Sequence, residues 1–236
     1  MLFETCRSRK WLALAVMTLC AATHAGAKDL DCPAFPQPDA KVEWVAQYMV
    51  YNGVPMSVKR FDSSRSVAEI LAFYRQLWAG VGPLAPVEND VSQWKTISAK
   101  RGKCFFTVQV QAVGTTASTG LLSATQQSDM ASITSADNKL PMMTGSAVIN
   151  DIEHRDEGKN ARTVLLSNTF SPESNASFYR QTMADQGWKM ISSYQMTTAK
   201  GPGITIVMKK GMAEASIVIT RTGSRSTVLA TVADNP

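Results

Sequence analysis

The stretch Phe73-Tyr74-Arg75-Gln76 recurs as Phe178-Tyr179-Arg180-Gln181, 105 positions later (178 minus 73). At the same offset Ser66 corresponds to Ser171 and Gly82 to Gly187, so each copy follows a helix-start signal and precedes a glycine. Similarity at a fixed offset is the signature of a repeated structural unit. The sequence therefore predicts a duplicated domain, although the repeat by itself indicates no activity.

Each copy of the motif lies in a predicted helix. Ser66 is a good N-cap residue and Glu69 completes a capping box, which predicts a helix over 67–79. Ser171 caps the second helix, and Pro172 stands at its first position, where the missing N–H costs nothing. The aromatic residues of the motif recur at helical spacing and give each helix a face to bury against a sheet.

Segments rich in β-branched and aromatic residues surround each helix. Two of them precede the helix as a hairpin, and four follow it as a meander punctuated by glycine turns. The expected strands cover 42–50, 56–61, 84–88, 94–99, 104–112 and 121–125, and then 146–153, 161–167, 188–194, 203–209, 213–220 and 227–232. The predicted fold class is α+β: two tandem copies of a two-layer domain, each an antiparallel sheet covered by one helix.

We expect four segments along the chain. Residues 1–27 are predicted to be a signal peptide, 28–125 the first α+β repeat, 126–140 a polar linker and 141–236 the second repeat. The signal is indicated by basic residues, an apolar run over 11–22 and a small-residue cleavage site. This run is shorter than the roughly 20 residues that cross a bilayer, so no integral membrane segment is expected after removal of the signal. The signal is bacterial in style, and the predicted location is the periplasm, or outside the cell.

The charge of the chain is weakly positive. The sequence has a net charge of +5, and loss of Arg7, Arg9, Lys10 and Glu4 with the signal lowers it to +3. A balance this small does not favour nucleic acid as a partner.

Two cysteines remain after the signal, Cys32 and Cys104. In an oxidising compartment an isolated pair is most simply a disulfide. A metal or redox dithiol is the other interpretation, but there is no Cys-x-x-Cys spacing and no neighbouring histidine. We therefore predict a disulfide that ties the N-terminal arm to the first sheet.

Catalytic and metal-binding patterns are weak. His154 is the one histidine after the signal, and it lies in a charged segment predicted to be a hairpin tip. The sequence has no Gly-x-Ser-x-Gly elbow, and its carboxylates do not follow calcium-loop spacing. We expect a protein that is not an enzyme, with no catalytic residue, no metal and no cofactor.

The repeated motif also offers a candidate binding surface. Its tyrosines and arginines could face a ligand, with each guanidinium as a forked donor, or they could only anchor the helix and cover its solvated side. Tryptophans in both copies could add aromatic contacts in a cleft between the repeats. The candidate residues are Tyr74, Arg75, Tyr179, Arg180, Trp44 and Trp188.

A Pro-x-x-Ala near a strand, a Phe-x-Ser, a capped helix with Phe-Tyr-Arg, and Gly187-Trp188 together resemble exported bacterial envelope proteins that carry Phe-Tyr-Arg and Gly-Trp repeats. The first copy departs from this pattern, because Gly82-Pro83 stands where Gly-Trp would be. The resemblance covers most of each copy and implies an envelope location without an active site.

Two functions follow as hypotheses. The first is a non-enzymatic periplasmic interaction or scaffold protein whose exposed strands pair with an envelope or secretion-system protein. The alternative is a periplasmic binding protein for a small molecule or glycan held between the repeats. The sequence indicates neither the oligomeric state nor the orientation of the repeats.

Overall fold

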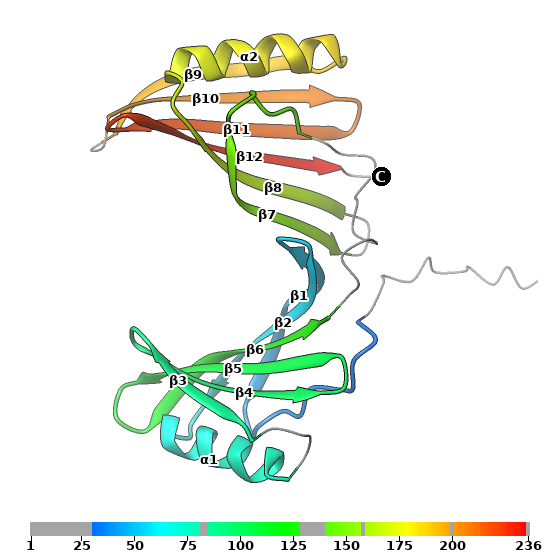
Figure 1. Ribbon diagram of the computed structural model, residues 1–236, viewed down its shortest axis with the longest axis vertical. Helices are drawn as coiled ribbons and strands as arrows, with labels where there is room; N and C mark the ends of the chain where they lie inside the picture. Colours follow the sequence, from blue (N-terminus) through cyan, green and yellow to red (C-terminus); the bar gives the residue numbers. More distant parts are fainter. Residues whose placement is uncertain (1–29, 81–84, 128–139, 157–158, 199–200, 235–236) are drawn as a thin grey trace, which may run out of the picture.

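The computed structural model describes residues 30–80, 85–127, 140–156, 159–198 and 201–234. The predicted signal peptide and most of the predicted linker lie outside these residues. The described chain forms twelve strands and two helices (Figure 1). In chain order they are β1 (Lys41–Tyr51), β2 (Val54–Ser63), α1 (Val67–Trp78), β3 (Val87–Val91), β4 (Trp94–Arg101), β5 (Cys104–Val113), β6 (Ala117–Gln126), β7 (Ala147–Asp156), β8 (Lys159–Asn168), α2 (Pro172–Asp185), β9 (Lys189–Thr198), β10 (Gly201–Lys210), β11 (Ala213–Thr222) and β12 (Arg225–Asp234).

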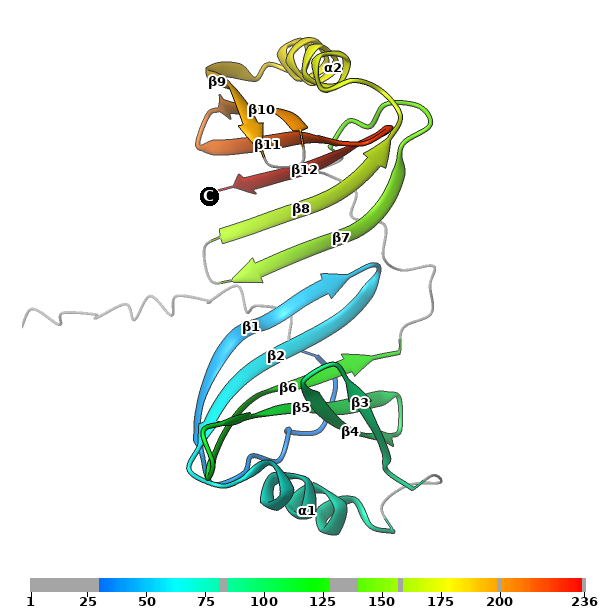
Figure 2. The ribbon, with the colours of Figure 1, turned by 90° about the vertical axis from the view of Figure 1, so that its left-hand side faces the viewer.

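The predicted fold class is wrong. Instead of two separate sheets, each covered by one helix, all twelve strands form one antiparallel sheet in the order β3-β4-β5-β6-β2-β1-β7-β8-β12-β11-β10-β9. The helices α1 and α2 lie at opposite ends of the molecule, where α1 packs mainly against β4 and β5 and α2 against β9, β10 and β11 (Figures 1 and 2). The central strands therefore lie away from both helices.

The two six-stranded halves join where β1 pairs with β7. The antiparallel register matches Met49 with His154, Val50 with Glu153 and Tyr51 with Ile152. In separate repeats β1 and β7 would each leave a row of unpaired backbone groups at a sheet edge, and such edges are prone to pair. Their mutual pairing removes both edges, which is the physical reason for the single sheet.

The turn between β1 and β2 strengthens this junction. Asn52 and Gly53 both have positive φ, as a tight two-residue hairpin turn requires. The Asn52 amide N–H donates to the Asp151 carbonyl at 2.8 Å, and the Asp151 N–H donates to Asn52 Oδ1 at 2.8 Å. The Tyr51 hydroxyl also donates to Asn150 Oδ1 at 3.0 Å. The hairpin tip of the first half is thus bonded to the second half.

The helix caps confirm the local predictions. The Ser66 side chain accepts from the Glu69 N–H, and the Glu69 carboxylate accepts from the Ser66 N–H, which is the predicted capping box. The Ser171 side chain accepts from the Ser174 N–H, and Pro172 begins α2. These bonds satisfy helix N–H groups that would otherwise lack partners.

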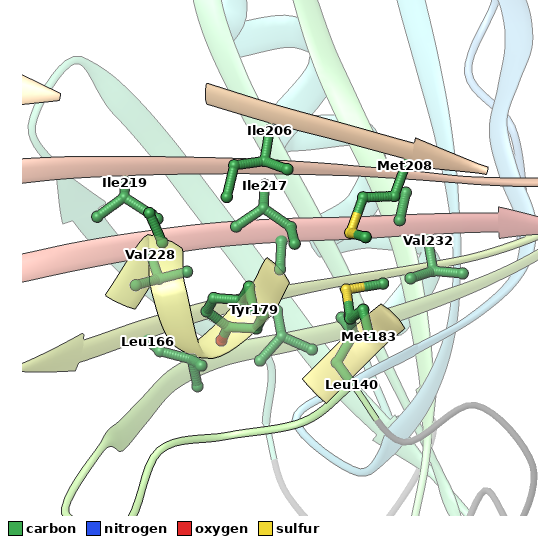
Figure 3. Close-up of a cluster of buried hydrophobic side chains, with 14 of the residues drawn as sticks. Leu140, Leu166, Tyr179, Met183, Ile206, Met208, Ile217, Ile219, Val228 and Val232 are labelled. Atoms are coloured by element: carbon green, nitrogen blue, oxygen red, sulfur yellow. The ribbon is translucent and has the colours of Figure 1, made fainter. Parts of the chain in front are cut away.

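Each half has its own hydrophobic core on the face that carries its helix. In the first core Ile70, Tyr74 and Trp78 of α1 are buried against Phe106 and other strand residues. Figure 3 shows the second core, where Tyr179 and Met183 of α2 lie among inward-facing aliphatic side chains of the strands. Burial of this apolar surface stabilises the helix on the sheet.

Among the described residues, no helix combines the length and the apolar character needed to cross a bilayer.

Candidate functional site

A cavity of about 310 Å³ lies in the first half, beneath the N-terminal arm (residues 30–40). One wall comes from the arm and the other from β1, β2 and β6. The lining residues are Leu30, Cys32, Pro33, Ala34, Phe35, Gln37, Trp44, Gln47, Ser57, Lys59, Leu122 and Ala124. The cavity therefore lies within one half rather than in the predicted cleft between two repeats.

A disulfide fixes the start of the arm. Cys32 is bonded to Cys104 at the first residue of β5, which confirms the predicted pair. Asp31 forms an ion pair with Lys103, and its N–H donates to Gln126 Oε1 at 2.9 Å. The lysine also lowers the pKa of the Asp31 carboxyl.

The middle of the arm packs onto the first core. The Phe35 ring lies edge-on to Phe106 and Tyr74, with centroids 5.1 and 6.2 Å away. The Tyr74 hydroxyl donates to the Pro36 carbonyl at 2.9 Å. The first tyrosine of the repeated motif therefore holds the arm that walls the cavity.

The sheet wall of the cavity is set by strand register. Lys59 of β2 pairs with Trp44 of β1 and with Leu122 of β6, so the three side chains stand on one face. Lys59 Nζ lies 4.1 Å from the centroid of the Trp44 ring. This distance allows a cation–π interaction, which holds the ammonium group at the cavity.

Lys59 is the one charged residue in the cavity lining. Within the described parts of the chain, no carboxylate lies within ion-pair distance of its ammonium group. Apolar and aromatic side chains supply most of the lining, and Gln37, Gln47 and Ser57 add neutral hydrogen-bonding groups. The arrangement is chemically suited to a ligand with an apolar body and one negative charge.

The predicted binding residues do not form one surface. Tyr74 belongs to the first core and Tyr179 to the second, and each is at most 1% exposed. Burial raises the pKa of Tyr179 to about 12 and raises that of Tyr74 as well. Their neutral forms therefore favour folding up to about pH 10, and this contribution is lost as the pH rises through the raised values, because the unfolded chain ionises first.

The arginines of the motif have local partners. Arg75 makes a bidentate ion pair with Glu88, with 2.9 Å between Nη2 and Oε2. This pairing lowers the pKa of the glutamate. Arg180 donates to Ser193 Oγ at 3.0 Å. Recognition of a ligand by either guanidinium stays a prediction.

The two predicted tryptophans differ in surroundings. Trp188 is partly buried against the second core, whereas Trp44 is 51% exposed and lines the cavity. Of the six candidate residues, only Trp44 lies at this site.

Sequence reasoning missed Lys59 and Phe35. Side chains alternate along a strand, so the strand expected over 56–61 places Lys59 on the same face as Phe61, which is fully buried. A lysine at an inward-facing strand position was therefore a usable signal. Phe35 had no such signal, because it lies in an arm without periodic structure.

The described residues contain no group of three histidine, cysteine, aspartate or glutamate side chains arranged to hold a metal ion.

Comparison with known proteins gives one similarity. A family described as START domain-like matches residues 148–228, which run from β7 into β12. No curated protein and no solved structure matches the chain. The chain is thus similar to START domain-like proteins over its second half, while the cavity lies in the first half.

Proposed function

We propose that this protein is a non-enzymatic binding protein for a small amphipathic anion, held in the cavity beneath the arm. The observation that carries the proposal is Lys59, a cation fixed at an otherwise uncharged and largely apolar cavity. The ligand class is an apolar or aromatic carboxylate. The proposal assigns no reaction and no cofactor.

The size of the cavity supports a small ligand. About 310 Å³ is near the lower end of the range of ligand pockets, which is roughly 300–1,000 Å³. Apolar walls favour the body of the ligand because burial removes its surface from water. The amide groups of Gln37 and Gln47 can donate to the oxygens of its head group.

The position of Lys59 supports a negative head group. The Trp44 ring holds the ammonium group in place before binding, so less side-chain freedom is lost when a carboxylate arrives. Because the cavity lining includes no acidic residue, the attraction is not offset there by an internal counter-charge.

The anchoring of the arm supports a binding site that is formed before the ligand binds. The arm is held by the disulfide to Cys104 and by the Tyr74 hydrogen bond to Pro36. The START domain-like match supports ligand binding in general terms, and it falls on the other half. We place the protein in the periplasm or outside the cell because of the basic and apolar pattern of residues 1–27.

Calorimetric titration with decanoate and with its neutral counterpart decanol tests the proposal. We expect Lys59→Met to weaken decanoate binding by about tenfold or more, since it removes one charge-assisted contact, and to leave decanol binding nearly unchanged. The matched control is Lys100→Met, because Lys100 also lies over an aromatic ring, 5.0 Å from the Phe105 centroid, and is not a lining residue.

Two outcomes contradict the proposal. One is that the wild-type chain binds neither probe. The other is that Lys59→Met and Lys100→Met bind decanoate equally well.

A scaffold role in envelope or secretion-system assembly is the second candidate function. It is favoured by a separate observation: β9 is ten residues long and, among the described residues, pairs with β10 alone.

A further inference from the structure

The described sheet ends in two edge strands of different character, β3 and β9. β3 has five residues, two of which are the carboxylates Glu88 and Asp90. Glu88 is paired with Arg75, and Asp90 with Lys95. A short strand with charged side chains is a common protection against edge-to-edge pairing.

β9 lacks most of this protection. It has ten residues, and Lys189 at its first position is its one charged residue. Ser192 pairs with Val207 and Met190 with Met208, so Ile191 between them forms a β-bulge. Residues 192–198 then pair regularly with β10. This regular segment, Ser-Ser-Tyr-Gln-Met-Thr-Thr, is uncharged and contains no proline. Among the described residues β9 pairs on one side only, with β10.

The segment also exposes large side chains. Tyr194 is 64% exposed and Met196 36%. They pair with Thr205 and Gly203, whereas Gln195 pairs with Ile204, a member of the core beneath α2. Since side chains alternate along a strand, Tyr194 and Met196 stand on the face away from α2.

We propose that β9 pairs antiparallel with β9 of a second copy of this chain, so that the sheet continues across a two-fold axis. If the axis passes through Gln195, Gln195 faces its own copy and Tyr194 faces Met196 of the second copy. Thioether–aromatic contacts of this kind are favourable. The pairing is closed, because it uses the same surface on both copies.

The charge pattern selects a second copy as the occupant. Residues 192–198 offer no charge to complement a charged partner, and in this register each Lys189 lies at the far end from the other, so no like charges meet across the strands. Pairing with β3 of another copy would instead be head-to-tail, which gives rings or open filaments rather than a dimer. The chain already joins two edges antiparallel at β1 and β7, the first strands of its two halves.

Sedimentation equilibrium over about 1 to 100 µM tests the proposal, a range in which a modest edge interface changes occupancy. We expect a dimer of the wild-type chain. Gln195→Lys places two like charges opposite each other at the axis and should raise the dimer Kd by about tenfold or more. The matched control is Asn89→Lys at the centre of β3, which should leave the dimer unchanged.

Cysteine crosslinking gives an independent readout. Under mild oxidation we expect Gln195→Cys to form a covalent dimer and Asn89→Cys to remain mostly monomeric. A monomer at every concentration, a dimer sensitive to Asn89→Lys but not to Gln195→Lys, or species that grow steadily with concentration would each overturn the proposal. None of these readouts depends on decanoate binding, so the two proposals can fail separately.

Discussion

Equivalent positions in the two halves of the sheet carry different chemistry. Counting back from the helix caps Ser66 and Ser171, Lys59 corresponds to Val164 and Ser57 to Arg162. In the first half these positions line the cavity. In the second half Arg162 instead donates to Asp151 through Nε at 2.9 Å and Nη2 at 2.6 Å.

The cross-strand neighbours extend the comparison. Trp44 pairs with Lys59, as Asp151 pairs with Val164. One half thus offers an aromatic ring and an ammonium group to a cavity, while the other uses its inward face for a partly buried ion pair. The comparison teaches that one strand order can either line a cavity or bury an ion pair at the same positions. The inward-facing side chains at those positions decide which of the two occurs.

The cores differ in a compensating way. A Cβ atom built on Gly120 would lie 2.5 Å from the Phe61 ring and 2.2 Å from the Gln109 carbonyl oxygen. Phe61 pairs with Gly120, and at the corresponding place Leu166 pairs with Val228. The first half pairs a phenylalanine with a glycine, which has no side chain. The second half pairs a leucine with a valine, two side chains of intermediate size. Both combinations fill the interior densely.

The arms differ most. The first arm is held by a disulfide and a tyrosine hydrogen bond. The second half contains no cysteine, and its entering segment is anchored by Leu140, which is buried in the second core.

Removing the disulfide should have the largest effect on stability, because the disulfide is present in the first half and has no counterpart in the second. We expect Cys32→Ser with Cys104→Ser to lower the free energy of unfolding by about 3 kcal/mol, because a loop of 72 residues is released. Decanoate binding should fall as well, since the arm is one wall of the cavity. Urea unfolding and calorimetry measure the two effects. Equal binding by the double variant and the wild type would show that the arm does not shape the site.

Breaking the ion pair of the second half should have the second-largest effect on stability. Arg162→Met leaves Asp151, 28% exposed, without its forked donor, and we expect a loss of about 2 kcal/mol. Arg75→Met in the first half breaks a more exposed pair and should cost less than Arg162→Met, because water screens exposed charges. Urea midpoints of the two variants give the comparison. Equal costs would mean that the second-half pair is not what stabilises its inward face.

The motif tyrosines should show the smallest difference. Tyr74→Phe removes the hydrogen bond to Pro36 and should cost about 1 kcal/mol. The Tyr179 hydroxyl has no hydrogen-bond partner among the described residues, so Tyr179→Phe should cost less than about 0.5 kcal/mol. Thermal unfolding of both variants tests the order. A larger loss for Tyr179→Phe than for Tyr74→Phe would contradict this order, and an unchanged stability of Tyr74→Phe would show that its hydrogen bond does not stabilise the arm.

Local structure was largely predictable from the sequence. The caps at Ser66 and Ser171 have specific chemical signatures, and each lies where expected. The single sheet was not predictable, because the junction of β1 and β7 depends on three residue pairs and on hydrogen bonds between segments about 100 positions apart. No periodic pattern encodes such a contact.

The site was only partly predictable. Cys32 and Cys104 were paired correctly because the chain offers few alternatives after the predicted signal. Trp44 was named as a candidate, but its neighbour Lys59 was not, since their contact follows from strand register rather than from spacing along the chain. The predicted duplication of a domain stays a prediction.

The strand β1 contributes to both the cavity wall and the junction between the two halves. Trp44, near its start, borders the cavity, and Met49 to Tyr51, at its end, bind the second half. Two register shifts separate these places along β1, between Trp44 and Ala46 and between Ala46 and Met49. A single irregular strand thus contributes both to the cavity wall and to the junction between the halves.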